Sequence, residues 1–223
     1  MKVLRISTGI FPIPPVVGGA VERYIYHLSN SMGRKGVEEH LVGDLDGSVR
    51  FEEKVIPHSV GTIKFSFKAG FYSWVLNFLI GSFLAVKTAI VLLLIRRWRY
   101  DIINGHDLLS TYVLLMIRKI FGSKVFGTSP ILFTIHGSTQ RRTPYRGLKG
   151  LVSLIGRALN RFVWNNADHL IALGSIPKKE LIHDWRIPEK KVSVIPPGVD
   201  VDFFQPSSEF ISILKEKYGV KDR

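Results

Sequence analysis

Three groups of residues in this chain have the types and the spacing of a ligand site. Gly18 and Gly19 close a proline-rich loop, Asn104 to Asp107 form a polar run, and His136 precedes a glycine. Each group comes after a short apolar segment that is typical of a buried strand. Because the carboxyl ends of parallel strands border the ligand crevice of an open α/β sheet, we expect the three groups to meet at one edge.

The glycine loop is suited to binding an anion. Gly18 and Gly19 have no Cβ, so backbone N–H groups can approach a phosphate there, and a helix that begins near Ala20 adds the positive end of its dipole. The alternative is that the two glycines only allow the chain to turn into the helix. Neither G-x-G-x-x-G nor G-x-x-x-x-G-K-[ST] occurs, so the dinucleotide fingerprint and the P-loop are both excluded.

The polar groups after the two later strands supply hydrogen-bonding side chains. Asn104, His106 and Asp107 follow one predicted strand, and His136 follows the next. A histidine in such a position either faces a ligand or only caps the turn before Gly137. We therefore regard the histidines as candidate site residues with two open interpretations.

The charge balance favours anionic partners. The 223 residues include 31 Lys and Arg against 18 Asp and Glu, which gives a formal net charge of +13. Nucleotides, nucleic acid, phosphorylated substrates and an acidic membrane surface all suit this balance. The basic loop from Thr139 to Gly150, which contains Arg141 and Arg142, is either solvated or anion-binding.

Composition also excludes several classes of protein. With 46% hydrophobic residues the chain can bury a substantial core, and with no cysteine it has no disulfide framework, thiolate metal site or cysteine nucleophile. No signal peptide precedes the first predicted strand, so we expect a cytoplasmic location.

The elements that must position these residues alternate between strand and helix. Strands are predicted at Val3 to Ile6, Glu39 to Val42, Lys54 to Ile56, Asp101 to Ile103, Ile131 to Ile135, His169 to Leu173 and Val192 to Ile195. Helices are predicted at Val21 to Lys35, Leu108 to Ile120, Leu151 to Asn165, from Pro177, and at Glu209 to Tyr218. This alternation predicts a Rossmann-like three-layer α/β/α domain with a parallel sheet.

The segment from Phe71 to Ile95 is unusually apolar. Its only charged residue is Lys87, and the basic cluster Arg96, Arg97 and Arg99 follows it. Its length permits a membrane span, but a span would separate strands that must pair in one sheet. A buried crossover, formed by one long helix or by two shorter helices broken near Gly81, is our preferred interpretation, and peripheral contact with a membrane remains an alternative.

Five segments together resemble the amino-terminal half of GT-B fold retaining glycosyltransferases, the group related to sucrose and glycogen synthases and mannosyltransferases. They occur in the family's order, as AVERYIYHLSNSMGRKG (20–36), YDIINGHD (100–107), ILFTIHG (131–137), ADHLIALGSIPKKEL (167–181) and VSVIPPGVDVDFFQP (192–206). The corresponding family patterns are G-G-x-E, D-V-V-H-x-H-D, T-x-H-G, A-D-x-V-I-A-x-S and V-x-V-I-P-N-G-V-D-x-x-x-F-x-P.

The resemblance implies transfer of a sugar, with retention, from a nucleoside diphosphate sugar to an acceptor held mainly by this half. It implies that His136 faces the transferred sugar and that Gly18, Gly19 and Gly174 lie on the donor side. It assigns the acceptor side to Glu22, Asn104, His106, Asp107, Arg141 and Arg142, with a phosphorylated or lipid-linked acceptor as one option. Members of the family generally need no bound metal, so we expect no metal and no cofactor beyond the donor substrate.

Four positions depart from the family pattern. One extra residue separates the glycine pair from Glu22, Asn104 replaces the first histidine of H-x-H, Gly174 stands in place of serine, and Pro197 replaces the asparagine of P-N-G. The first departure leaves either Gly18 and Gly19 or Gly19 and Ala20 as the equivalent of the family's glycine pair, and the third removes a serine from the donor side. The fourth stiffens the connection between the two halves of such an enzyme.

The resemblance also predicts the organisation of the chain. Residues 1–195 form the acceptor-binding domain, 196–206 form an interdomain linker, and 207–223 begin a donor-binding domain that is missing here and must act as a partner. Such a fragment is expected to be inactive alone. The alternative is a stand-alone basic module for nucleic acid or an anionic membrane, but no nucleic-acid-binding motif is present, so we expect no nucleic-acid partner. Peripheral contact at the inner face of the cell membrane stays open.

Overall fold

A computed structural model describes residues 1–7, 11–15, 19–45, 47–60, 83, 87, 99–122, 128–137, 147–199, 201 and 208–219. Its strands are β1 (Lys2–Ile6), β2 (Glu38–Gly43), β3 (Val55–Ser59), β4 (Ile102–Gly105), β5 (Ile131–Ile135), β6 (His169–Ala172) and β7 (Val192–Val194). Its helices are α1 (Ala20–Arg34), α3 (Leu108–Phe121), α5 (Gly147–Asn166), α6 (Ser175–His183) and α7 (Ser208–Tyr218), with a short 3₁₀ turn at Glu189–Lys191.

The strands form one parallel sheet in the order β3-β2-β1-β4-β5-β6-β7. The chain therefore starts in the centre, builds outward to β3, crosses back over β1, and then builds outward to β7. In register, Arg5 of β1 lies beside Asn104 of β4, and Leu132 of β5 lies beside the same Asn104. This order is that of a doubly wound sheet, whose ligand crevice lies where the winding changes direction, between β1 and β4.

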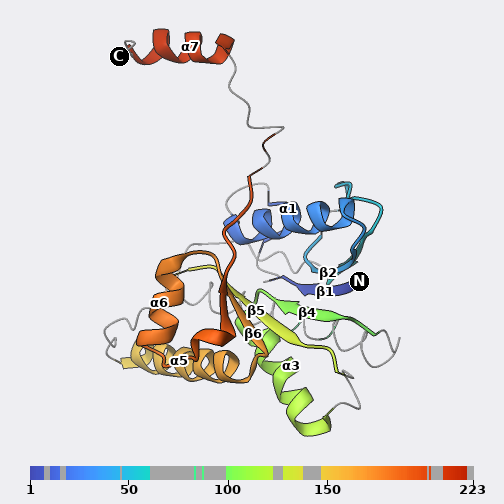
Figure 1. Ribbon diagram of the computed structural model, residues 1–223, viewed down its shortest axis with the longest axis vertical. Helices are drawn as coiled ribbons and strands as arrows, with labels where there is room; N and C mark the ends of the chain where they lie inside the picture. Colours follow the sequence, from blue (N-terminus) through green and yellow to red (C-terminus); the bar gives the residue numbers. More distant parts are fainter. Residues whose placement is uncertain are drawn as a thin grey trace.

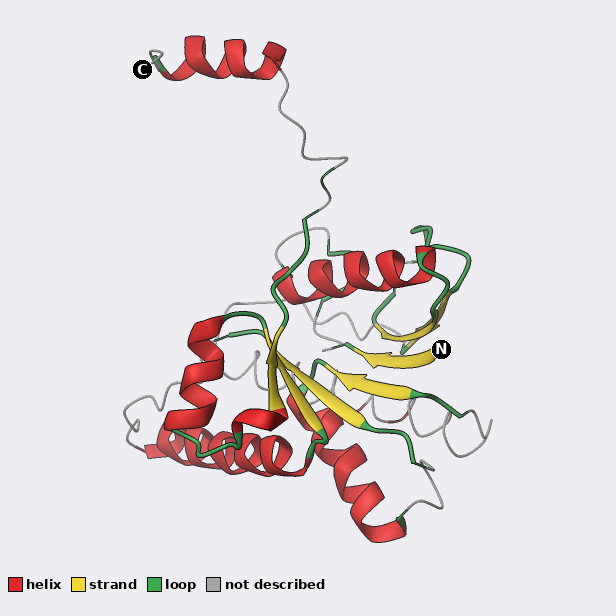
Figure 2. Cartoon of the chain, in the orientation of Figure 1, coloured by secondary structure: helices red, strands yellow, loops and turns green. Residues whose placement is uncertain are grey.

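Helices cover both faces of the sheet (Figure 1). Helix α1 lies on one face, and α3, α5 and α6 lie on the other. The prediction of a Rossmann-like α/β/α domain with a parallel sheet is confirmed by this arrangement. Figure 2 shows that α7 lies apart from these layers, beyond the end of the last strand.

The larger core lies under α3, α5 and α6 and is apolar. Alternate residues of the central strands point into it, because side chains along a strand alternate between faces. The strands contribute Leu4, Ile6, Val42, Ile103, Phe133, Ile135 and Leu170, and the helices contribute Leu114, Leu115, Val163, Trp164 and Leu181. All of these side chains are buried.

The apolar cluster under α1 is smaller. It is centred on Ile13, Ile25, Leu41 and Val55. The other strand residues of this face include polar and charged side chains, among them Arg5, which is only 4% exposed. The two faces of one sheet therefore differ in chemistry.

Most predicted element bounds agree with the structure to within a few residues. Two differ in a useful way: α5 begins at Gly147 rather than Leu151, and β4 extends to Gly105, so Asn104 lies inside the strand. The apolar segment 71–95 lies outside the described residues apart from Phe83 and Lys87, which are helical and exposed. In the described part of the chain, no helix combines the length and apolar character that crossing a bilayer requires.

Candidate functional site

The turn from β4 into α3 is built by Asp107, which caps the helix. Its side chain accepts a hydrogen bond from the Ser110 backbone N–H at 2.7 Å and another from the Ser110 hydroxyl. The Thr111 hydroxyl donates to the Asp107 carbonyl oxygen at 2.7 Å. The structure thus shows Asp107 as the N-cap of α3, with its side chain only 2% exposed. Contact between Asp107 and an acceptor stays a prediction.

Glycine is required at position 105, the last residue of β4. A Cβ added there would lie 1.9 Å from the Thr111 Oγ1. The close approach of β4 to α3 is therefore possible only because Gly105 has no side chain. It brings the residue that follows, His106, to the carboxyl edge of the sheet.

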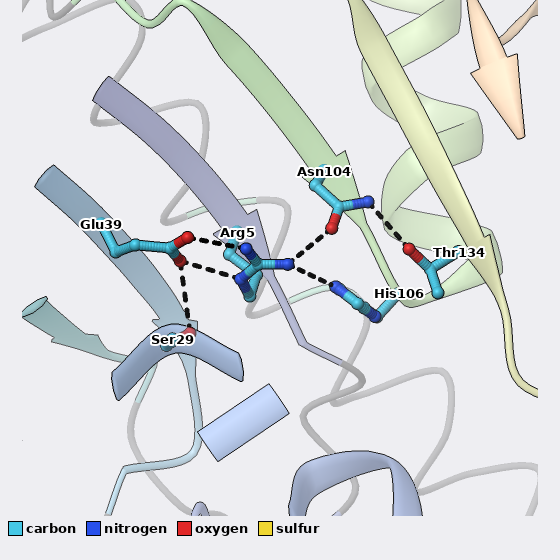
Figure 3. A network of polar contacts seen from close by, with 6 residues as sticks. All are labelled: Arg5, Ser29, Glu39, Asn104, His106 and Thr134. Atoms are coloured by element: carbon cyan, nitrogen blue, oxygen red, sulfur yellow. Dashed lines mark hydrogen bonds and ion pairs between the residues drawn. The ribbon is translucent and has the colours of Figure 1, made fainter. Parts of the chain in front are cut away.

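A charged residue lies in the middle of the central strand. Arg5 donates from Nε to Glu39 Oε2 at 2.8 Å and from Nη2 to Glu39 Oε1 at 2.7 Å (Figure 3). The side chains of Arg5 and Glu39 are 5% and 0% exposed, so the pair is fully shielded from water. Ser29 of α1 adds a hydrogen bond from its hydroxyl to Glu39 Oε2 at 3.2 Å.

The same guanidinium connects this ion pair to the edge of the sheet. Its Nη1 donates to Asn104 Oδ1 at 2.6 Å and lies 3.1 Å from His106 Nε2. Asn104 in turn donates from Nδ2 to the Thr134 hydroxyl oxygen at 3.0 Å. A polar network thus runs across β2, β1, β4 and β5 on the α1 face (Figure 3).

The network ends at two histidines in contact. His106 Nδ1 lies 2.7 Å from His136 Nε2, so the residues after β4 and β5 meet as predicted. The ring of Tyr24, on α1, lies edge-on to the His136 ring with centroids 5.3 Å apart, and 6.0 Å from the His106 ring. His106 is buried and His136 is only partly buried, which places His136 nearer to solvent.

Burial sets the protonation of both imidazoles. It lowers the pKa of His136 from 6.5 to about 4. Burial lowers the pKa of His106 well below its usual value, and the positive charge of Arg5 and then His136 add to this effect. Both rings are therefore neutral near pH 7 and can act as hydrogen-bonding groups without carrying charge.

The amino end of α1 lies at the same edge. Gly19 is its N-cap in the left-handed region, with φ of 67°, and a Cβ there would lie 2.6 Å from the Pro15 Cβ. Glu22 lies in the first turn and is only 3% exposed. Gly18 was predicted to bind phosphate together with Gly19, and it lies outside the described residues.

The remaining predicted residues divide into two sets. Gly174 follows β6 and is the N-cap of α6 in extended backbone, so it lies one strand further along the same edge than His136. Arg141 and Arg142 lie outside the described residues. Among the residues that the structure describes, no group of three or more His, Asp or Glu side chains is placed to hold a metal ion.

Sequence reasoning missed the buried half of the site. Arg5, Glu39, Tyr24, Ser29 and Thr134 were not among the predicted residues. A signal was present for two of them, because Arg5 and Glu39 are charged residues within otherwise buried strands. A fully buried charge needs a partner, so two such charges in neighbouring strands favour an ion pair between them.

Comparisons with known proteins identify the family. Residues 17–203 match the model of Glycosyltransferase Family 4. The chain is also similar to UDP-Gal:alpha-D-GlcNAc-diphosphoundecaprenol alpha-1,3-galactosyltransferase of Escherichia coli, with 27% identity over 128 residues, which are 57% of this chain and 31% of that protein.

Solved structures show the same fold. The catalytic domain of starch synthase IV from Arabidopsis thaliana has a TM-score of 0.62 and 14% identity, covering 99% of this chain and 60% of that one. Anabaena HepE in complex with UDP-glucose has a TM-score of 0.55 and 16% identity, covering 98% and 50%. This chain spans about half the length of such structures and has the fold of one half of a GT-B glycosyltransferase, and with the match over residues 17–203 it belongs to Glycosyltransferase Family 4.

Proposed function

We propose that this chain is the acceptor-side half of a retaining glycosyltransferase that transfers a sugar from a nucleoside diphosphate sugar to an acceptor. The observation that carries the proposal is the contact between His106 and His136 at the carboxyl edge, within the range that matches the family. In an open α/β sheet this edge is where ligands bind. The name of the galactosyltransferase relative and the UDP-glucose in a structural neighbour support a UDP-sugar as donor.

In this proposal His136 hydrogen-bonds the transferred sugar. A retaining transfer develops positive charge on the donor ring and negative charge on the departing phosphate, and a fixed polar group stabilises such changes without reorganising. The backbone at Gly18 and Gly19 approaches the donor phosphates, and Gly174 lies on the same side. Glu22 and the two arginines, Arg141 and Arg142, face the acceptor.

Asn104, His106 and Asp107 take indirect roles in the same proposal. All three are at most 5% exposed, and each is bonded to other protein groups. We therefore assign them to shaping the acceptor side rather than to direct contact with the sugar.

The proposed enzyme needs a second domain. Residues 1–195 form the acceptor domain, 196–206 connect it, and a donor-binding domain that begins near 207 supplies the other wall of the cleft. Holding two reactants in position is worth roughly 7 to 11 kcal/mol of the barrier. We therefore expect this chain alone to be inactive, whereas the longer protein that includes the donor domain transfers sugar.

Sugar transfer by the longer protein tests the proposal. UDP-galactose and UDP-glucose serve as donors, and a polyprenyl diphosphate that carries one sugar serves as acceptor. We expect transfer with retained anomeric configuration and a fall in kcat of about a hundredfold for His136→Ala. His169→Ala is the matched control, because its ring bonds Ser193 Oγ at 2.8 Å at the amino end of β6. Transfer at wild-type rate by His136→Ala, or no transfer from any nucleoside diphosphate sugar, would contradict the proposal.

A lipid-linked acceptor would bring this domain to a membrane surface. The relative's name includes a diphosphoundecaprenol acceptor, and the net charge of +13 suits anionic lipid. Each Lys or Arg near such a surface is worth about 1 kcal/mol. We expect the chain to sediment with acidic vesicles at low salt, less so at high salt, and less after Arg96→Gln, Arg97→Gln and Arg99→Gln together. Vesicle binding that depends neither on salt nor on these three arginines would argue against peripheral contact.

A further inference from the structure

The hydrogen-bond chain through Arg5 has a forced direction. A guanidinium has five N–H donors and no acceptor, and it stays protonated at any pH at which proteins fold. Every partner of Arg5 must therefore accept. Two of its donors bind Glu39 oxygens at 2.7 and 2.8 Å, and the two N–H bonds of Nη1 face Asn104 Oδ1 and His106 Nε2.

This geometry determines where the proton of His106 lies. At 3.1 Å from Arg5 Nη1, the Nε2 atom of His106 must present its lone pair. A neutral imidazole carries one proton, so that proton is on Nδ1. The amide of Asn104 is oriented by the same rule, with its oxygen toward Arg5 and its nitrogen toward the Thr134 hydroxyl.

The constraint passes on to the second histidine. His106 Nδ1–H donates to His136 Nε2 across 2.7 Å, so Nε2 of His136 also presents a lone pair. The proton of His136 is therefore on Nδ1. Burial lowers the pKa of both histidines, so both rings are neutral near pH 7. Neither ring therefore takes a second proton that would remove the lone pair from its Nε2 atom.

We propose that Arg5, held by Glu39, is a positioning residue that fixes the tautomer of His136 through His106, so that His136 offers an Nδ1–H donor to its ligand. In this tautomer Nε2 is occupied by His106 and Nδ1 carries the proton. His136 then recognises an oxygen that accepts a hydrogen bond, such as a sugar hydroxyl oxygen, and does not remove a proton as a base. The use of this donor in sugar transfer rests on the proposed function, whereas the tautomer itself does not.

Two neighbouring features hold the chain of hydrogen bonds in place. The Tyr24 ring, 5.3 Å from the His136 ring and edge-on to it, supports the imidazole through its ring rather than through a charge. The Arg5–Glu39 pair is the charged end of the chain, and it is shielded from solvent. Its bidentate geometry holds the guanidinium plane in place, so the direction of every later hydrogen bond is set at Arg5.

The tautomers can be read directly in the unmodified chain. Two-bond proton–nitrogen spectra of this chain with ¹⁵N-labelled histidine, at pH 7, separate the Nδ1–H and Nε2–H forms. We expect the Nδ1–H form at both His106 and His136. His183, which is exposed, is the internal control and should show an exchanging mixture. An Nε2–H form at His136 would overturn the proposal, whatever the enzyme's activity.

Two variants test whether the hydrogen bonds from Arg5 through His106 set the tautomer of His136. Arg5→Met with Glu39→Met removes both charges together, and His106→Leu interrupts the chain at its centre. In each, we expect His136 to lose its single tautomer and show a mixture. The matched control is Arg34→Met with Glu52→Met, an exposed ion pair with N···O of 3.1 Å and side chains 54% and 40% exposed, which should leave the His136 spectrum unchanged.

The outcomes separate this inference from the proposed function. If His136 keeps a pure Nδ1–H form after His106→Leu, the chain from Arg5 does not set the tautomer and the inference fails, even if sugar transfer is found. If the spectra are as expected and no nucleoside diphosphate sugar is used, the proposed function fails alone. Should the double variant not fold, the wild-type spectrum and His106→Leu still decide.

Discussion

The two faces of the sheet are buried by different chemistry. Under α3, α5 and α6, alternate strand residues such as Leu4, Ile103 and Phe133 form one apolar core. Under α1, the residues on the opposite side of the same strands include Arg5 and Asn104, which belong to a polar network. The first face needs only apolar side chains of suitable volume, whereas the second needs particular atoms at particular distances.

This difference separates stability from positioning. Burying apolar area stabilises a domain by about 25 cal/mol per Å². A buried ion pair gains little on balance, since the cost of removing two charges from water offsets their attraction. The polar face is therefore better explained by the orientation that it gives to His106 and His136 than by any gain in free energy of unfolding.

Breaking the polar face at one residue should have the largest effect. Arg5→Met leaves the Glu39 carboxylate buried without its cation, which costs about 3–5 kcal/mol of unfolding free energy. Urea unfolding at pH 7 measures this loss. A loss below about 1 kcal/mol would mean that Glu39 is already reached by water, since exposed pairs contribute no more than that.

Breaking the apolar face should cost a similar or smaller amount, with a different side effect. Leu114 of α3 is fully buried in the larger apolar core. Leu114→Ala leaves a cavity there, which lowers the free energy of unfolding by about 2–5 kcal/mol. The histidine spectra should stay unchanged, because the polar network lies on the other face. A changed tautomer at His136 in this variant would show that the two faces are not independent.

Acid should weaken the polar face. Burial lowers the pKa of His136 to about 4 in the folded chain, against about 6.5 when unfolded, and that of His106 is also lowered. As the pH falls from 6.5 toward 4, the unfolded chain binds protons that the folded chain does not, so stability declines. We expect the urea midpoint to fall over this range, and to fall less in His136→Gln than in the exposed control His183→Gln. Equal declines in both variants would count against this account.

The helix cap at the site edge should contribute least. Asp107→Ala removes the acceptor of the Ser110 backbone N–H and should cost about 1 kcal/mol. Thermal unfolding of this chain measures the loss directly. No measurable change would remove the capping role and favour the predicted contact with the acceptor.

The sequence was sufficient to predict most strands and helices and the family. Strand alternation and helix periodicity depend on neighbouring residues, so the bounds of β1, β5 and α1 came out within about two residues. The meeting of His106 and His136 followed from their positions after parallel strands.

The polar network could not be predicted in the same way. Arg5 and Glu39 are paired only because β1 and β2 are neighbours in a particular register, and no local pattern encodes that register. Asn104 was expected after its strand, but its pairing beside Arg5 extends β4 and buries it. The direction of each hydrogen bond depends on these long-range contacts, so it becomes visible only in three dimensions.

The central claim is that the polar face orients His136 rather than stabilises the domain. Arg5→Met with Glu39→Met tests it most directly, with unfolding free energy and kcat measured on the longer protein. Replacing both partners of a buried pair by apolar groups is often neutral or stabilising, so we predict a loss of unfolding free energy clearly smaller than for Arg5→Met alone. The loss that remains comes from the Arg5 bonds to Asn104 and His106. We predict that kcat falls by about tenfold or more, less than for loss of the His136 donor itself. A loss of stability as large as for Arg5→Met alone, with unchanged kcat, would contradict the claim.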